Sequence, residues 1–405
     1  MLAGALLLSS LAAGCGHRPA PVTEVVFWQT WPPAAIGPLV RGFEAANPGV
    51  RVDVVTLPAM GGEDSIAAAV ASGHPPDLCE LGSGDIPRYL ASGALSDWSA
   101  GVADLRDSLR GWPLCMVGDA IYGLPWQLGA RALFCNRALF ARAHVPAARA
   151  PQTWEQLGSA AARIQRLGGG VHGIGVPRPG SRDLFAAFMP FAWGNGGELL
   201  SAGLDSSRFD SRENLKALEF LVRLRRSAAI ATQDSLEREF AAGRLGMLLA
   251  GTSLFARLPA RGPAFEVGVT PVPLPAADRG EPASYARGTL LVSFTASRRK
   301  ELALRLARWL ARPENTLALA IATPRGEPSN VGADTAAWYR RHPARRQLVL
   351  QAATARFAPH HAVWDSMEIA VEEQVGLALY GGKPTGQAIA DADARLAELA
   401  ARKGR

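Results

Sequence analysis

The beginning of the chain alternates between strand and helix patterns, and this alternation constrains the fold more than any other feature. Residues 22–28 form a β-branched, apolar run, and residues 50–54 alternate between valine and charged side chains. Between them, residues 36–43 carry apolar side chains three and four positions apart, the spacing of one helix face. This strand–helix–strand unit predicts a parallel strand pair with a right-handed crossover. A helix pattern over residues 66–72 and a strand pattern over residues 77–81 repeat it, so we expect a doubly wound α/β region.

Composition indicates a folded, globular chain. Its 405 residues are enough for two or three ordinary domains, and 48% hydrophobic with 20% charged residues is unlike a disordered protein. The formal net charge of +7 alone would be compatible with nucleic-acid binding. The arginines are scattered through helix patterns and form no basic run, so we expect no nucleic-acid partner.

The start of the chain has the pattern of a lipoprotein leader. Residues 1–14 are uncharged and mostly apolar, yet too few to span a bilayer, which takes about 20 residues. They end in Leu-Ala-Ala-Gly before Cys15, which resembles the lipobox where a bacterial leader is cut before a lipid-modified cysteine. We therefore expect a signal peptide over residues 1–14, acylation of Cys15, a tether over residues 15–23 and an extracytoplasmic, lipid-anchored protein. The alternative is an ordinary N-terminal helix.

Three cysteines remain if Cys15 is acylated: Cys79, Cys115 and Cys135. An odd number in an exported protein leaves at least one free thiol, so no disulfide framework is predicted. Each lies in an apolar context, and we expect all three to be buried as small hydrophobic side chains.

The segment from Asp119 to Leu157 looks like a chain that leaves one domain and enters another. Pro125 interrupts an apolar run, and proline cannot donate to a sheet ladder, so we expect a sheet edge or a strand that leaves the sheet. Thr153 and Gln156 have the spacing of a capping box, which predicts a helix beginning there.

Further helix starts are predicted downstream. Asp210 and Glu213 have the spacing of an N-cap and N3 residue. Ser297 is predicted to cap a later helix whose inward face comprises Ala303, Leu306, Ala307 and Leu310. The carboxylate pair Glu372-Glu373 lies in another helix pattern, where we expect a solvated face.

The segment around residues 119–157 also resembles the lobe-crossing region of family 1 extracellular solute-binding proteins, the sugar-binding receptors of bacterial ABC importers. The likeness rests on Tyr122-Gly-Leu-Pro-Trp126, on Leu133-Phe-Cys-Asn136, and on Pro151-Gln-Thr-Trp-Glu-Gln-Leu157. This chain carries Cys135 where the family usually has tyrosine. Other family-like motifs follow in order: Phe43-Glu44 with Pro48 and Val52, Asp77 with Gly93-Ala94-Leu95, Phe240 to Gly251, and Gly381 to Pro384 with Ala388 and Ala392.

This resemblance implies a two-lobe periplasmic-binding-protein fold of type II, in which each lobe is a mixed sheet flanked by helices. It implies three hinge crossings, near residues 127–132, 284–288 and 325–331. The expected N-terminal lobe comprises residues 24–128 and 288–326, and the expected C-terminal lobe comprises residues 129–287 and 327–405. It further implies a monomer that captures a mono- or oligosaccharide between its lobes and delivers it to the transmembrane subunits of an ABC permease, without chemistry on the ligand.

Aromatic and amide side chains near predicted strand ends are the candidate binding residues. Tryptophan offers an apolar slab to a sugar face, and polar side chains offer donors and acceptors to its hydroxyls. In open α/β sheets, ligands collect beyond the carboxyl ends of strands. The candidates are Trp28, Gln29 and Trp31; Ser83 and Asp85; Trp126 and Gln127; Trp193, Asn195 and Glu198; Thr252 and Ser253; Tyr285 and Arg287; Arg325; and Trp364.

Each candidate also has a structural alternative. The tryptophans among them could pack in the core, which is the role expected for Trp98, Trp112, Trp154, Trp309 and Trp338. The charged candidates Asp85, Glu198, Arg287 and Arg325 could form surface or inter-lobe ion pairs.

Two other functions remain open from the sequence. A protein with the same two-lobe fold could instead bind an anion such as glycerol-3-phosphate through Arg287 and Arg325. An exported carbohydrate hydrolase would need two acids about 5–10 Å apart across a cleft. No cofactor is expected, because the only dinucleotide-like glycine pattern, residues 168–173, follows a helix instead of a strand. No metal site is expected either, since His360-His361 has no partner at ligand spacing.

Overall fold

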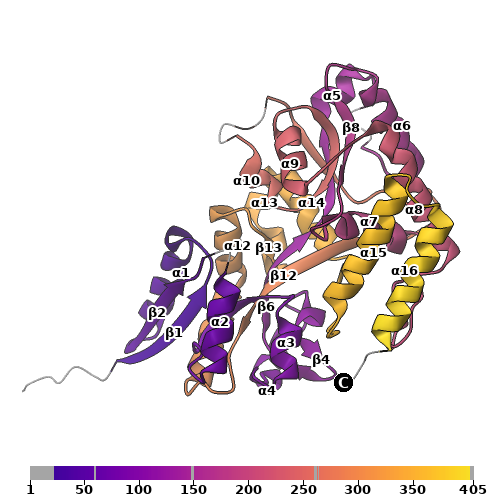
Figure 1. Ribbon diagram of the computed structural model, residues 1–405. Coiled ribbons are helices and arrows are strands. Elements are labelled where there is room, and N and C mark those ends of the chain that lie inside the picture. Colours follow the sequence, from indigo (N-terminus) through magenta and orange to yellow (C-terminus); the bar gives the residue numbers. More distant parts are fainter. Residues whose placement is uncertain (1–21, 59–60, 147–149, 260–261, 263, 402–405) are drawn as a thin grey trace, which may run out of the picture.

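The computed structural model describes residues 22–58, 61–146, 150–259, 262 and 264–401. Within these ranges the chain forms two mixed β-sheets with helices packed around them, and a small hairpin of β4 (Met116–Val117) and β5 (Ala120–Ile121) (Figure 1). The α/β prediction is confirmed. The predicted signal peptide, Cys15 and most of the tether lie outside the described residues.

The first sheet has seven strands in the order β13-β6-β12-β3-β1-β2, with β14 beside one end of β12. β1 pairs in parallel with β2 and β3, whereas β12 runs antiparallel to β3 and β6. The strands are β1 (Thr23–Gln29), β2 (Val50–Thr56), β3 (Leu78–Gly82), β6 (Leu124–Ala130), β12 (Ser284–Val292), β13 (Glu327–Pro328) and β14 (Ala355–Phe357).

The predicted opening unit is confirmed. β1 and β2 pair in parallel along their whole length. Helix α1 (Pro33–Ala46) connects them, and the apolar side chains of its predicted face, from Ile36 to Phe43, are buried. The helices near this sheet are α1, α2 (Gly62–Ala71), α3 (Ile86–Ala91), α4 (Ser99–Val102), α11 (Lys300–Leu310) and α12 (Pro313–Ala322), with the 3₁₀ turns η1 (Ala103–Leu105) and η2 (Trp112–Leu114).

The second sheet has five strands in the order β11-β7-β10-β8-β9. They are β7 (Ala132–Asn136), β8 (His172–Pro177), β9 (Ala228–Ala231), β10 (Leu245–Ala250) and β11 (Val267–Thr270). Its helices are α5 (Arg137–Arg142), α6 (Trp154–Gln165), α7 (Asp183–Gly194), α8 (Arg212–Leu224), α9 (Gln233–Ala241) and α10 (Leu254–Arg257), with the turn η3 (Arg225–Ser227).

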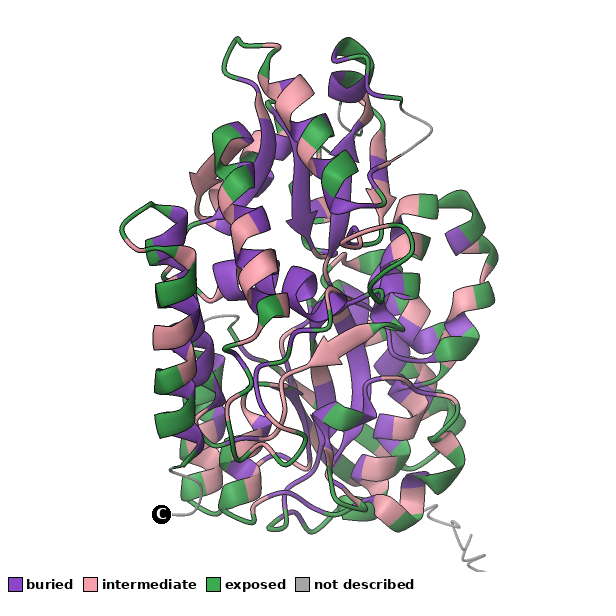
Figure 2. Cartoon of the chain, turned by 90° about the vertical axis from the view of Figure 1, so that its right-hand side faces the viewer, coloured by how far each residue is buried: buried purple, intermediate pink, exposed green. Residues whose placement is uncertain are grey.

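Each sheet has its own apolar core. One core combines buried side chains from residues 25–128 and 290–319. The other combines side chains from residues 133–285 and 364–400. The buried strands at the centre of each half are visible in Figure 2.

Three segments pass between the sheets. β6 leaves the first sheet and continues through Arg131 into β7 of the second, so the prediction that the strand containing Pro125 leaves its sheet is confirmed. β12 begins beside β14 and ends between β3 and β6. β13 pairs with β6, and from it the chain enters the turn η4 (Val331–Thr335).

Four helices complete the chain: α13 (Ala337–Arg341), α14 (Pro343–Ala352), α15 (Trp364–Leu379) and α16 (Thr385–Ala400). The last two form an antiparallel pair that packs against α7 and α8 (Figure 1, yellow). α15 is therefore buried on more than one side. The prediction of a solvated face at Glu372-Glu373 is wrong for Glu372, which is buried, while Glu373 is exposed.

The predicted helix starts are partly right. Thr153 caps α6 as predicted, because its hydroxyl accepts a hydrogen bond from the Gln156 amide. The N-cap of α8 is Ser211, one residue after the predicted Asp210. Ser297 lies two residues before the N-cap of α11, and its hydroxyl instead donates to Asp77. The buried face of α11 is nevertheless the predicted one.

Cys79, Cys115 and Cys135 are free and buried, as predicted. Burial raises the pKa of all three thiols, that of Cys135 to about 12, so they remain protonated at neutral pH. Within the described ranges, no helix is both long and apolar enough to cross a bilayer.

Candidate functional site

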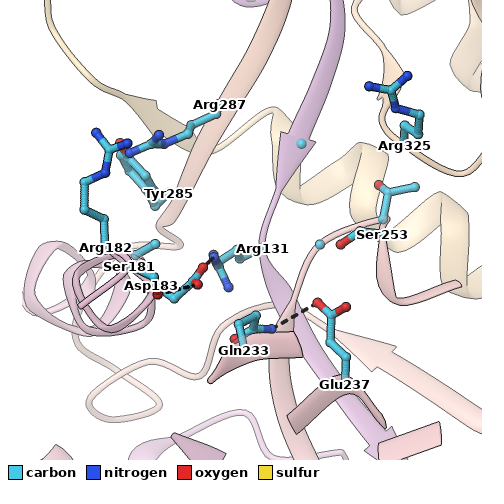
Figure 3. Close-up of a pocket in the computed structure, with 14 residues that line it drawn as sticks. Arg131, Ser181, Arg182, Asp183, Gln233, Glu237, Ser253, Tyr285, Arg287 and Arg325 are labelled. Atoms are coloured by element: carbon cyan, nitrogen blue, oxygen red, sulfur yellow. Dashed lines mark hydrogen bonds and ion pairs between the residues drawn. The ribbon is translucent and has the colours of Figure 1, made fainter. Parts of the chain in front are cut away.

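A polar cavity of about 300 Å³ lies where the chain passes between the two sheets (Figure 3). Its walls come from β6, the loop into α7, the start of α9, the loop after β10, β12, and the segment before β13. The lining residues are Gly129, Arg131, Ser181, Arg182, Asp183, Ala186, Gln233, Glu237, Gly251, Thr252, Ser253, Tyr285, Arg287 and Arg325.

A buried carboxylate, Glu368 on α15, organises one wall of the cavity. It accepts hydrogen bonds from the Tyr285 hydroxyl, from Trp364 Nε1 at 2.8 Å and from Arg287 Nη2 at 2.6 Å. Arg182 Nη1 lies 3.7 Å from the same carboxylate. Burial and the Glu368 charge raise the pKa of Tyr285, so its hydroxyl stays protonated. Glu368 thus fixes the orientation of Tyr285 and Arg287, which line the cavity, and of Trp364, which does not.

The loop that enters α7 is held by a second buried acid, Glu372. It accepts hydrogen bonds from the backbone amides of Gly180, Arg182 and Leu184 at 2.9–3.0 Å. This satisfies amides at the helix N-terminus, which have no partner within the helix. Arg182 there has φ +64°, a conformation that non-glycine residues rarely adopt. The bonds to Glu372 fix this strained turn, which presents Ser181, Arg182 and Asp183 to the cavity.

Asp183 and Arg131 form an ion pair at the centre of the cavity wall. Arg131 Nη2 lies 2.6 Å from Asp183 Oδ1, and Ser181 Oγ donates to Asp183 Oδ2 at 2.8 Å. Arg131 belongs to the segment between β6 and β7, and Asp183 begins α7, so this pair links the crossing segment to the second sheet's helices.

Gln233 and Glu237 lie side by side at the start of α9, and Figure 3 shows the hydrogen bond between them. Gln233 Nε2 donates to Glu237 Oε1 at 3.2 Å, while Gln233 Oε1 is buried and has no partner among the described residues. Burial raises the pKa of Glu237, and Gln233 and more distant arginines oppose that shift. The Glu237 carboxylate is thus a hydrogen-bond acceptor in the cavity lining, and Arg257 lies 3.8 Å from its other oxygen.

Replacing Glu237 by glutamine should stabilise the unliganded protein. The folded-state pKa of Glu237 lies above its unfolded value, so the folded state holds the proton more tightly, and this advantage is lost as pH rises through the folded pKa. Glu237→Gln should therefore gain about 0.5–1 kcal/mol at pH 7 and little at pH 4. Urea unfolding at both pH values measures this. Glu239→Gln on the same helix is the control, because Arg244 lowers the pKa of Glu239; an equal gain there would contradict the explanation.

Arg325 closes the cavity from the first sheet. Its guanidinium donates to the Thr30 carbonyl at 2.8 Å and to the Thr30 hydroxyl at 3.1 Å, and lies 4.8 Å from the centre of the Trp31 ring. Glu80, which is buried, holds the same loop by accepting from the Thr30 amide and from Trp31 Nε1, each at 2.9 Å.

Five of the predicted site residues line the cavity: Thr252, Ser253, Tyr285, Arg287 and Arg325. The Thr252 hydroxyl is directed away from solvent and donates to Glu327 at 3.2 Å. Ser253 is exposed at the cavity mouth. The other predicted residues do not line it.

The predicted residues after β1 and at the first crossing lie in or near the first core. Trp31 and Trp126 are buried and contact each other edge to face, with ring centres 5.8 Å apart. Gln29 bonds to Thr56, and Trp28 is half-buried against the same core. Gln127 is buried and donates to the Thr316 carbonyl at 3.1 Å. In this conformation the two buried indoles and two buried amides have almost no surface to offer a ligand.

Ser83 and Asp85 follow β3, as expected, but neither lines the cavity. The Ser83 hydroxyl accepts from the Gly288 amide at 3.3 Å. Burial raises the pKa of Asp85; Arg88, 3.6 Å away, opposes this, while Glu63 and Asp365 add to it.

The remaining four predicted residues are Trp193 on α7, Asn195 and Glu198 after that helix, and Trp364 at the start of α15. Trp193 and Trp364 are buried; Trp193 packs 5.9 Å from the Tyr285 ring, and Trp364 bonds to Glu368. Asn195 binds the Glu213 carbonyl at 2.9 Å. Glu198 is exposed and pairs with Arg356 at 2.6 Å, so for this residue the ion-pair alternative applies.

Sequence reasoning missed six polar lining residues: Arg131, Ser181, Arg182, Asp183, Gln233 and Glu237. Ser181, Arg182 and Asp183 come after β8, and Gln233 comes after β9, both strands of the second sheet. Their position after strand ends is the signal that could have found them. Among the described residues, no cluster of three or more histidine, cysteine or acidic side chains could hold a metal ion.

Comparison with known proteins identifies the family. The family model for bacterial extracellular solute-binding proteins matches residues 39–347. The chain belongs to this family. This solute-binding protein is 28% identical over 343 residues to an uncharacterized lipoprotein from the oleD 5′ region of Streptomyces antibioticus, covering 79% of this chain and 74% of that relative.

Solved structures share the fold of this solute-binding protein. The cyclic α-maltosyl-1,6-maltose-binding protein of Arthrobacter globiformis aligns with a TM-score of 0.83 at 22% identity, covering 94% of this chain and 99% of that chain. UgpB of Mycobacterium tuberculosis, in complex with glycerophosphocholine, aligns with a TM-score of 0.79 at 20% identity, covering 94% and 99%. The predicted type II two-lobe fold is thereby confirmed.

Proposed function

We propose that this solute-binding protein captures a carbohydrate in the cavity between its two lobes and delivers it to an ABC permease. The observation that carries the proposal is the cavity itself, which lies at the passages between the two sheets and is lined by side chains from both. Its donors (Arg131, Arg287, Arg325) and its acceptor Glu237 match the mixed donor and acceptor character of sugar hydroxyls.

The proposed lobes follow the two apolar cores. The N-terminal lobe comprises residues 24–128 and 288–326, and the C-terminal lobe residues 129–287 and 327–405; the two cores fall within these bounds. The three passages between the sheets would act as hinges that absorb rotation when the lobes close on the ligand. A ligand that binds the closed form more tightly shifts the population toward it, and this closed form would dock on the permease.

The proposal places the protein outside the cytoplasm as a monomer, anchored by lipid at Cys15. The leader pattern supports the anchor, and a relative with 28% identity carries the name lipoprotein. The protein would have no catalytic role, because binding and release suffice for delivery.

A ligand screen tests the proposed function. Mono- and oligosaccharides and sugar phosphates should include at least one compound that raises Tm and changes tryptophan fluorescence, since binding to the native state alone stabilises it. If no compound in a broad panel does either, the carbohydrate proposal fails.

A phosphate-bearing solute is the second candidate, because four arginines line the cavity. Guanidinium groups bind phosphate oxygens through paired, charge-assisted hydrogen bonds. Arg325→Gln should then weaken glycerol-3-phosphate about 10- to 100-fold, while a neutral sugar should lose only a few-fold. Calorimetric titration of both compounds decides between the candidates, with the exposed Arg312→Gln as the matched control; equal losses for both would contradict a phosphate site at Arg325.

A further inference from the structure

We propose that the face around the start of β1 docks on anionic phospholipid headgroups and so sets how the anchored protein sits on its membrane. The face, called here the N-terminal basic face, consists of two adjoining grooves that share Arg305. The proposal rests on the lipid attachment at Cys15 for its geometry, and it concerns a different surface from the ligand cavity.

The first groove, about 590 Å³, lies where the described chain begins. Thr23 and Val50, the first residues of β1 and β2, form one side. Arg298, Arg299 and Lys300 form the other side, and all three are exposed. Three cationic side chains at the start of α11 therefore lie beside the point where the chain enters β1.

The second groove, about 430 Å³, continues the positive charge along α11. Arg305 and Arg308 lie on one face of this helix, and Arg312 follows one turn later, so the three share a stripe with spacings of three and four residues. Arg312 lies 4.5 Å from the centre of the Trp309 ring, which holds its charge at the surface. Arg308 is paired with Asp104 at 2.6 Å.

The charge balance of this face favours an anionic partner. Six arginine or lysine side chains line the two grooves, and Glu301 is the one carboxylate among the described lining residues. Asp104 neutralises Arg308 from outside the lining, so the face keeps an excess of four positive charges. All six side chains are near the surface, and the two grooves are open to solvent. Such open grooves suit a layer of mobile phosphate groups better than one enclosed ligand. Clusters of four to eight such cations beside a membrane attachment are attracted to anionic lipid surfaces.

The tether limits how far this face can be from the membrane. Only seven residues lie between Cys15 and Thr23, which makes eight steps along the chain, and an extended chain spans at most about 3.3–3.6 Å per step. The groove beside Thr23 is therefore held within about 30 Å of an acylated Cys15. Figure 1 shows that the chain enters β1 at the end of the first-sheet half that lies away from α5 and α6. Docking through this face would thus hold the first-sheet half against the lipid and the second-sheet half away from it.

Vesicle sedimentation tests the proposal without the lipid anchor. A chain that starts at Gly16 retains every residue of both sheets and both cores. It should sediment with vesicles containing about one third phosphatidylglycerol and not with pure phosphatidylcholine vesicles. About 0.5 M salt should release it, because dissolved ions screen the charges and shorten the range of their attraction. The triple variant Arg298→Gln, Arg299→Gln, Lys300→Gln should lower the partition onto anionic vesicles about tenfold or more.

A charge-matched triple variant controls for net charge. Arg340→Gln, Arg341→Gln and Arg346→Gln remove the same charge from exposed positions on α13 and α14, outside both grooves, and should keep most of the binding. Equal binding to both vesicle types, or equal loss in the two triple variants, would overturn the proposal. Either triple variant should retain the ligand-induced Tm shift, so failure of membrane docking is distinguishable from failure of the proposed solute binding.

Discussion

Replacing Glu327 by glutamine is expected to destabilise the protein by about 3–5 kcal/mol. Glu327 belongs to β13, is buried, and forms an ion pair with Arg345, whose side chain is 8% exposed. The Tyr339 hydroxyl donates to the same carboxylate at 2.7 Å, and the Thr252 hydroxyl at 3.2 Å. Glutamine leaves the buried guanidinium without a counter-charge and replaces one acceptor oxygen by a donor. The free energy of unfolding from urea titration measures the loss.

Two further variants make this prediction specific. Glu314→Gln changes an exposed acid at the start of α12 and should alter stability by less than about 0.5 kcal/mol. Glu327→Gln combined with Arg345→Met should be less destabilised than the sum of the single changes, because each single change leaves the other partner unpaired. Additive losses would contradict a coupled buried pair.

Replacing Glu368 by glutamine should impair stability and ligand binding together. The carboxylate is fully buried and orients Tyr285, Arg287 and Trp364. The Arg287 side chain is 43% exposed and can regain water, so the expected loss is about 2–3 kcal/mol, less than for a fully buried pair. Ligand affinity should fall about tenfold or more, because the cavity side chains lose their fixed orientation.

The control for this variant lies on the same helix. Glu373→Gln changes an exposed acid of α15 and should leave both unfolding free energy and affinity close to those of the unchanged protein. If Glu368→Gln lowers stability without any change in affinity, the carboxylate supports the core alone and does not position the cavity side chains.

The sequence predicts the first sheet well because its strands and helices have regular apolar spacing. The β1–α1–β2 unit and the crossing after Pro125 follow from such local patterns. Beside the second sheet, the helix start at Thr153 also follows from a local pattern, the capping box. The prediction fails for a helix that is buried on several sides, as α15 is, because such a helix has no single apolar face. Glu372 of α15 was predicted to be solvated, but it bonds to the loop that enters α7.

The candidate site was only partly predictable, because the burial of a side chain depends on segments that are distant in the sequence. Tyr285, Arg287 and Arg325 were found because they adjoin crossings implied by the family resemblance. The aromatic candidates Trp31 and Trp126 carry the residue type expected of a sugar platform, but whether an indole faces a cleft or a core depends on packing between distant segments. Here the two rings pack against each other, and Arg325 covers that of Trp31.

The polar character of the cavity depends on contacts that no local pattern encodes. Arg131 and Asp183 are distant in sequence and meet because the segment after β6 passes the start of α7. Glu368, which organises Tyr285 and Arg287, comes from the last part of the chain. The sequence identifies such residues only as charged, and the fold brings them together.

Calorimetric titration of two tryptophan variants is the most direct test of the claim that the solute binds in this cavity. Ser253 is exposed at the cavity mouth, so Ser253→Trp should fill much of the roughly 300 Å³ space without disturbing the fold. Ser159→Trp places the same bulk on α6 in a different groove. With a sugar that stabilises the unchanged protein, Ser253→Trp should abolish measurable binding and Ser159→Trp should keep it. Undiminished binding by a correctly folded Ser253→Trp protein would contradict the assignment of the cavity.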